Sequence, residues 1–187
     1  PFTARDRDAG DVHERAAYRA LCDGVFSDAK GRDPACADLQ WLVQQLLELL
    51  KAVADEGKPT FVSTGMSTYD DIDTAVEIFR DRDCPFVLMH CVSEYPLAEE
   101  DVNLRAIVEL RSKYDCPVGY SGHEASMIPG TLAALMGAVA VERHITLDRA
   151  MYGSDQAASL ERPGLYKMVD YIRTVTTVLG DGTKRVS

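Results

Sequence analysis

The chain lacks long hydrophobic runs, a surplus of basic residues and paired cysteine motifs. No stretch approaches the roughly 18 uninterrupted apolar residues of a membrane-spanning helix, and the N-terminus shows no basic-then-apolar signal pattern. Lysine and arginine number 20 against 30 acidic residues, and the resulting net charge of −10 is the wrong sign for a general nucleic-acid binder. We therefore expect no membrane partner and no nucleic-acid partner.

The five cysteines are odd in number and form no C-x-x-C pair. Disulfide frameworks are typical of shorter chains with an even cysteine count, so free thiols in a reducing compartment are expected. Cys84 and Cys91 flank a strongly apolar stretch, which favours buried cysteines acting as small hydrophobic residues rather than zinc ligands. The cysteine pattern therefore predicts a cytoplasmic protein.

From Asp38 onward, helical and strand patterns alternate regularly. Residues 1–37 are charged, broken by glycine and proline, and predict at most one short helix near 12–21. Ser67 with Asp70 forms a capping-box sequence. The later patterns predict strands at 59–62, 85–89, 117–120 and 138–141, among helices near 38–57, 67–79, 104–111, 127–136 and 163–179. Continuous apolar strands alternating with helices indicate an α/β fold with a parallel sheet.

Polar side chains collect where the predicted strands end. Ser63, His90, Ser121, His123 and His144 each follow such a strand. In parallel α/β folds, and in (β/α)8 barrels especially, that edge forms the active-site face. Three histidines at one edge indicate a divalent metal with positions open to substrate, although spacing alone does not say which are ligands. Each histidine by itself is also compatible with a structural role.

A loop of small and polar residues, Gly153–Glu161, follows the fourth predicted strand. It is compatible with a surface loop that leads into the last helix. It is equally compatible with presenting Asp155 to the strand ends as a hydrogen-bond acceptor for substrate hydroxyls. Ser63 and Ser121 allow two interpretations as well, because hydroxyls at strand ends either bind phosphate or close turns.

Six segments, in order along the chain, carry a resemblance to a known family. They are GKPTFVSTGMST (57–68), LMHCVSEYP (88–96), EDVNLRAI (100–107), VGYSGHE (118–124), ERHITLD (142–148) and GSDQAASLE (153–161). In these motifs the chain resembles the sialic acid synthases, also called N-acetylneuraminate synthases, within a wider group that makes nonulosonic acids. The resemblance runs from about Leu49 to the C-terminus.

The resemblance implies a fold and a reaction. Members of the family are (β/α)8 barrels that condense phosphoenolpyruvate with N-acetylmannosamine or its 6-phosphate and release phosphate. They use a divalent metal, so we expect Mn²⁺, with Mg²⁺ or Co²⁺ as alternatives. Family members form dimers, which leaves a homodimer open for this chain, and the resemblance leaves the acceptor sugar open as well.

The resemblance also implies the roles of seven residues. His123 and His144 match the metal ligands and are therefore the expected catalytic residues, while His90 becomes a neighbour of the site rather than a ligand. The expected substrate-binding residues are Ser63, Ser93, Tyr95, Ser121 and Asp155. Of these, the serines at 63 and 121 match contacts of phosphoenolpyruvate, residues 93 and 95 match positions near both substrates, and residue 155 matches a contact of the amino sugar.

The matching part supplies four βα units, whereas a complete (β/α)8 barrel needs about 250 residues. We therefore expect an unassigned segment at 1–37 and a partial synthase barrel at 38–187. A half barrel exposes two strand edges and an apolar interior. We expect the isolated chain to have little or no activity, and the alternative to a synthase is a truncated, non-catalytic fragment that retains only metal or ligand binding.

Overall fold

The computed structural model describes residues 37–153 and 155–186, with side chains from Gln45 onward. The chain divides into two compact units, residues 1–52 and 53–187. The helix α2, Ala37–Asp55, confirms the helix predicted near 38–57. The expectations for residues 1–36, including the helix near 12–21, lie outside the described residues. None of the helices within the described residues is long and apolar enough to cross a membrane.

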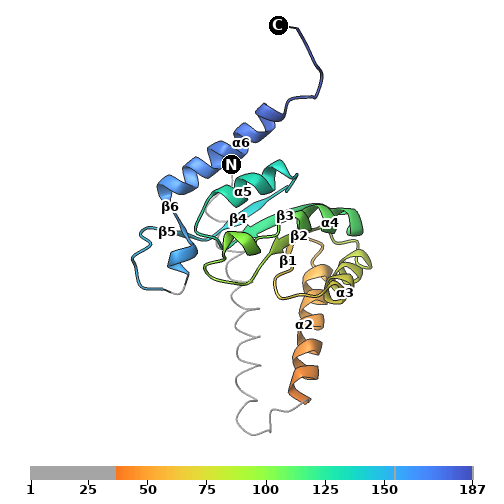
Figure 1. Cartoon of the computed structure of the whole chain (residues 1–187). Helices are drawn as coiled ribbons and strands as arrows, with labels where there is room; N and C mark the ends of the chain where they lie inside the picture. The colour runs from red at the N-terminus through yellow and green to blue at the C-terminus, as the bar shows by residue number, and fades with distance from the viewer. Residues whose placement is uncertain (1–36, 154, 187) are drawn as a thin grey trace. The chain divides into compact units, whose positions relative to one another are not determined.

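Four parallel strands form the sheet of the second unit, in the order β1-β2-β3-β4 (Figure 1). The strands are β1 Thr60–Ser63, β2 Phe86–Cys91, β3 Val118–Gly122 and β4 Val141–Arg143. Each connection between neighbouring strands contains a helix, as parallel pairing requires: α3 Tyr69–Arg80, α4 Arg105–Tyr114 and α5 Ile128–Leu135. The prediction of a parallel α/β fold is confirmed.

Some element boundaries differ from the sequence-based expectation. Strand β2 runs to Cys91 because its pairing with β3 continues that far, so His90 lies inside the strand and not after it. Strand β4 begins where it was expected to end, because the Ala138 amide still donates to the carbonyl of Ala133 in α5. The capping box of α3 lies one residue later than predicted, at Thr68 and Asp71.

Three short elements and one long helix follow the sheet. Two-residue strands β5, Ile145–Thr146, and β6, Leu160–Glu161, form a separate parallel pair, which no periodicity predicted because neither is long enough to show one. Between them lies a 3-10 turn, η2, at Gln156–Ala158. A second such turn, η1, occupies Glu99–Asp101 between β2 and α4. The last helix, α6, spans Arg162–Leu179, has proline in its first turn and ends at Gly180, as predicted.

The main core lies between the sheet and helices α3, α4 and α5. It contains alternate strand residues, including Leu88, Val118 and Tyr120, together with helix residues such as Ile107, which is completely buried. Because successive strand residues point to opposite faces, the residues in between point away from these helices. Among those, Phe61 is 60% exposed, so this second face is only partly covered.

We expect Ile107→Ala to lower the free energy of unfolding by about 2–5 kcal/mol, because it removes a fully buried side chain from the core. The adjacent Val108, 38% exposed on the same helix, provides the matched control, and Val108→Ala should change stability by less than about 1 kcal/mol. Urea denaturation followed by circular dichroism measures both. Equal losses in the two variants would contradict this assignment of the core.

Candidate functional site

Two histidines and one tyrosine form an aromatic cluster at the carboxyl edge of the sheet. His123 directly follows β3 and His144 directly follows β4, and these two strands pair in parallel. The imidazole centroids lie 5.3 Å apart in an edge-to-face arrangement. Tyr95, from the loop after β2, has its ring centroid 4.2 Å from that of His123 and 5.6 Å from that of His144. Neighbouring strand ends therefore bring together two histidines that lie far apart in the sequence.

The hydrogen bond of His123 fixes which ring nitrogen is available. Its Nδ1 lies 2.7 Å from the carbonyl oxygen of Val92, and the side chain is buried. A carbonyl only accepts hydrogen bonds, so Nδ1 carries the hydrogen and, in the neutral ring, Nε2 keeps its lone pair. This is the second partner by which proteins orient histidines that bind metals. His123 thus presents Nε2 as a donor atom for a cation.

An acidic residue from the loop between β5 and β6 lies near His144. Its Nδ1 lies 3.6 Å from the Oδ2 of Asp155, and both side chains are partly exposed. The β5–β6 pair produces this proximity, because the Leu160 amide donates to the His144 carbonyl and returns the intervening loop to the end of β4. A carboxylate beside Nδ1 favours a hydrogen on that atom, which again leaves Nε2 for a ligand.

Two further predicted residues line the same edge. Ser121 donates a 2.7 Å hydrogen bond from Oγ to the carboxylate of Glu142, its register partner on β4. Ser63, at the end of β1, contacts the thiol of Cys91 at the end of β2. Burial raises the pKa of that thiol, so Cys91 stays protonated near neutral pH. Both serine hydroxyls therefore lie on the side of the sheet that faces away from the core helices.

Ser93 packs against the backbone of the loop after β1. A Cβ atom placed on Gly65 would come within 2.4 Å of the Ser93 Oγ and within 2.9 Å of the Cys91 Sγ. Real Cβ atoms do not approach other atoms so closely, so only glycine allows the two strand ends to meet here. The glycine of the STGM segment thus fixes the position of the Ser93 hydroxyl.

The Tyr95 hydroxyl stays protonated at neutral pH. Burial is the main cause of its raised pKa, and the neighbouring carboxylates of Asp155 and Glu142 raise it further. The ring is 44% exposed, so the hydroxyl can reach a ligand. The Tyr95 hydroxyl is therefore available as a hydrogen-bond donor.

A cavity of about 610 Å³ opens at the carboxyl ends of β1 and β2. It is lined from the ends of β1 and β2 and from helices α3 and α4, by residues that include Thr64, Ser67, His90, Ser93 and Glu94. His123 and His144 are not in its lining. Because its lining includes residues of α3 and α4 together with His90, the cavity opens toward the helix-covered side of the strand ends, and Ser93 is the one predicted site residue that lines it.

His90 does not join the other two histidines. It points into the helix-covered side of the sheet, where its Nε2 lies 2.9 Å from the carbonyl oxygen of Val102. Burial lowers the pKa of this imidazole, which is therefore neutral. The expectation of three converging histidines, drawn from strand ends alone, is wrong because His90 lies inside β2 with the opposite orientation to Cys91. The assignment of His90 as a neighbour agrees with this position.

His123 and His144 are the two residues whose chemistry suits a metal at this edge. In the described ranges, 37–153 and 155–186, no three histidine, cysteine or acidic side chains are close enough together to hold a metal ion. Two imidazoles with free Nε2 atoms still fit the chemistry of a divalent cation that takes its remaining ligands from substrate and water.

A comparison with protein families shows which family the chain belongs to. The family model described as the NeuB family matches residues 43–184. The chain belongs to the NeuB family. The predicted resemblance to the sialic acid synthases is thereby confirmed, in the part of the chain where its six motifs lie.

Relatives with different named products match at similar identity. The chain is 41% identical to human N-acetylneuraminate-9-phosphate synthase over 138 residues, which cover 73% of this chain and 38% of that protein. It is 37% identical to pseudaminic acid synthase from Campylobacter jejuni over 134 residues, which cover 71% and 39% of the two chains. The chain thus spans about two fifths of the length of these relatives.

A solved structure confirms the barrel-type fold. The crystal structure of the N-acetylneuraminic acid (sialic acid) synthetase from Leptospira borgpetersenii superposes with a TM-score of 0.71 and 36% identity. The match covers 80% of this chain and 57% of that one. The four parallel strands of the NeuB chain described here curl as a half-barrel.

The structure thus brings five predicted residues together and adds one that was missed. His123, His144, Tyr95 and Asp155 form one cluster, Ser121 adjoins it through Glu142, and the remaining two are Ser63 and Ser93 at the neighbouring strand ends. Glu142 was not among the predicted site residues. Its position in the ERHITLD segment could have indicated it, because a residue two before His144 on a strand lies on the same face.

We expect Gly65→Ala to destabilise the chain by about 1–3 kcal/mol, because the new methyl group would collide with Ser93 and Cys91. In Gly164→Ala the nearest neighbour, a Leu160 methyl, lies at 3.7 Å, so this helix position should tolerate alanine or gain up to about 1 kcal/mol. Urea denaturation of both variants measures the difference. A Gly65→Ala variant as stable as Gly164→Ala would show that the two strand ends do not meet as described.

Proposed function

We propose that this chain provides part of the active site of a nonulosonic acid synthase that condenses phosphoenolpyruvate with N-acetylmannosamine or its 6-phosphate and releases phosphate. Membership of the NeuB family and the names of its relatives support the reaction class. The observation that carries the proposal is the pair formed by His123 and His144, whose ring centroids lie 5.3 Å apart, with the Nδ1 of His123 bonded to a carbonyl and the Nδ1 of His144 3.6 Å from the Asp155 carboxylate.

The Nε2 atoms of His123 and His144 would hold a divalent cation, Mn²⁺ in the first instance and Mg²⁺ or Co²⁺ as alternatives. A cation held there would supply Lewis-acid polarisation of the aldehyde of the open-chain sugar, the carbon that carbon 3 of phosphoenolpyruvate would attack. The Val92 carbonyl would hold the His123 ring in orientation, and the Asp155 carboxylate, 3.6 Å from the His144 Nδ1, would do the same for His144 once they approach to hydrogen-bond distance.

The serine hydroxyls are the groups that would bind phosphoenolpyruvate. Ser63, Ser93 and Ser121 lie at three different strand ends or loops of one edge, a spread that suits the phosphate and carboxylate ends of one small molecule. A hydroxyl carries one hydrogen, so Ser121 donates either to Glu142 or to a phosphate oxygen. Binding of the phosphate therefore requires the Ser121 hydroxyl to turn away from Glu142.

Asp155 and Tyr95 would bind the amino sugar from its two sides. The partly exposed Asp155 carboxylate accepts hydrogen bonds from sugar hydroxyls, and the protonated Tyr95 hydroxyl donates to a sugar oxygen. Holding the sugar against both histidine rings places its aldehyde next to the phosphoenolpyruvate contacts. Such positioning supplies a large part of the catalysis of any two-substrate condensation.

We expect the chain to bind one Mn²⁺, measured by isothermal titration. His123→Ala and His144→Ala should each weaken binding at least tenfold, because each removes one of two imidazole ligands. His90→Gln is the matched control, since this histidine bonds a carbonyl on the other side of the sheet, and its Mn²⁺ affinity should equal that of the wild type. An unchanged affinity in the His123 and His144 variants would reject the assignment of the metal ligands.

We expect the chain with Mn²⁺, phosphoenolpyruvate and N-acetylmannosamine, or its 6-phosphate, to release phosphate slowly, and EDTA to abolish the release. Mass spectrometry of the product with each acceptor distinguishes the two sugars. Mn²⁺ binding without product would favour the alternative of a non-catalytic fragment that retains metal binding. A wild-type chain that neither binds Mn²⁺ nor forms product would count against the proposed function.

A further inference from the structure

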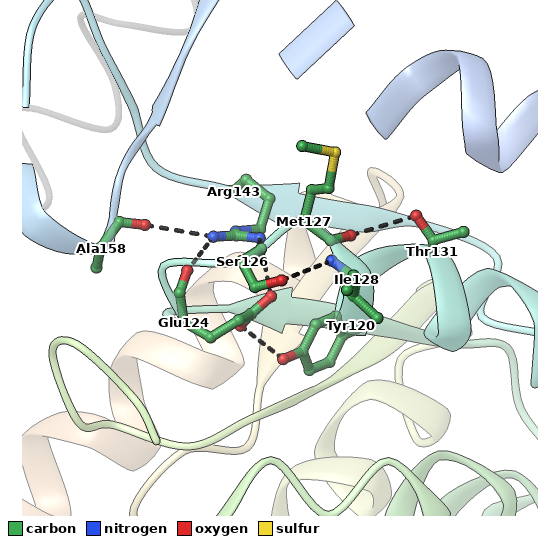
Figure 2. A network of polar contacts seen from close by, with 8 residues as sticks. All are labelled: Tyr120, Glu124, Ser126, Met127, Ile128, Thr131, Arg143 and Ala158. Carbon is green, nitrogen blue, oxygen red and sulfur yellow. Dashed lines mark hydrogen bonds and ion pairs between the residues drawn. The ribbon is translucent and has the colours of Figure 1, made fainter. Parts of the chain in front are cut away.

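A buried arginine at the end of β4 bonds to two other segments of the chain (Figure 2). The guanidinium of Arg143, 1% exposed, donates from its two terminal nitrogens to the Glu124 carboxylate at 2.8 Å and to the backbone carbonyls of Glu124, Ser126 and Ala158. The bonds to the carbonyls of Ser126 and Ala158 measure 2.7 and 3.3 Å. Arg143 thus links the end of β4 to the loop after β3 and to the turn η2.

Glu124, from the loop after β3, completes this network. Its carboxylate, 0% exposed, also accepts a 2.8 Å hydrogen bond from the Tyr120 hydroxyl. A Cβ atom on Gly122 would come within 2.7 Å of a Glu124 oxygen, so the glycine provides the space in which the carboxylate folds back over β3. The SGHE segment therefore has a second set of contacts, on the side of the sheet opposite to His123.

Each charged residue of the pair is the chain neighbour of a histidine of the site. Glu124 follows His123 and Arg143 precedes His144. Successive extended residues point to opposite sides, so the ion pair lies behind the two imidazoles and does not touch a ligand bound between them. The third segment that the arginine holds is also connected to the site, because the Ala158 amide donates to the carbonyl of Asp155.

We propose that Arg143 and Glu124 are positioning residues that set the separation of the His123 and His144 rings and the place of the Asp155 loop. This inference rests on the proposed function for its consequence in metal binding. The planar fork of an arginine is what allows one side chain to bond to carbonyls of two segments and to a carboxylate at once. A lysine in its place would keep the charge and lose the fork.

Stability alone is a weak reason for such a pair. A fully buried ion pair adds little net stability compared with apolar residues of similar volume, because both charges must lose their water. The pair also has a rigid geometry, because the terminal nitrogens of the buried guanidinium donate to fixed acceptors. A positional role therefore accounts for the pair better than a contribution to folding.

The test compares Arg143→Lys and the double variant Arg143→Met with Glu124→Gln, which leaves no unpaired buried charge and keeps an acceptor for the Tyr120 hydroxyl. Arg111→Met is the matched control, since Arg111 also donates to two loop carbonyls, those of Met136 and Gly137, away from the histidines. Thermal denaturation gives the temperature range in which each variant is folded, and the later measurements are made within that range.

Two measurements are made on the folded variants. Long-range ¹H–¹⁵N NMR of the imidazole rings reports the tautomer of His123, which should be the Nδ1–H form in the wild type and in the Arg111 variant. We expect a mixture of tautomers in both Arg143 variants, because the loop that carries His123 loses its fixed position. The Mn²⁺ affinity from isothermal titration should fall about 10–100-fold in the same variants.

The two measurements separate this inference from the proposed function. If the folded double variant keeps the Nδ1–H form of His123, the pair only stabilises the fold and the inference is overturned. If Arg143→Lys behaves as the wild type, charge and not the fork is what matters, which also overturns it. A wild-type chain that binds no Mn²⁺ rejects the proposed metal site, while the tautomer measurement still decides the role of the pair.

Discussion

The pairing of β3 with β4 is the constraint on which the rest of the site depends. Ser121 lies opposite Glu142 and Gly122 opposite Arg143, so the next residues of the two strands, His123 and His144, emerge side by side. A shift of this register by one residue would turn every side chain of β4 to the other face. It would separate the imidazoles and expose the arginine that now lies buried.

The same register serves two purposes on the two faces of the sheet. On one face it joins serine, glutamate and histidine side chains at the carboxyl edge, where ligands bind in parallel α/β folds. On the other face it brings Glu124 against Arg143 under the helices. The successive residues 121–124 thus contribute different things: Ser121 a hydroxyl, Gly122 room for the Glu124 carboxylate, and His123 an imidazole. We expect such a short motif to tolerate few substitutions, because each of its residues contacts a different neighbour.

The motifs and the apolar periodicity predicted most of the fold and of the site. Continuous apolar strands between helical patterns were enough to predict the parallel sheet, because parallel strands joined by helices are typically apolar on both faces. The resemblance identified the two histidines and Asp155, which the structure places within one cluster. The orientation of His90 was not predictable from its place in the sequence. Strand β2 extends further than expected, so His90 is hydrogen-bonded within the sheet and does not lie at its edge. The pattern of apolar residues does not show where strand pairing ends.

Local interactions along the chain are what the sequence by itself determined: helix faces, apolar strands, the cap of α3, the proline that opens α6 and the polar residues that follow strands. Contacts between distant segments were decided only by the tertiary structure. The orientation of His144 by Asp155 depends on the short pair β5–β6, and the Glu124–Arg143 ion pair depends on the β3–β4 register. Such contacts form because the packing of the helices onto the sheet fixes both the order of the strands and their register. The order and register that bury the most apolar surface depend on all segments of the sheet together, and no single segment determines them.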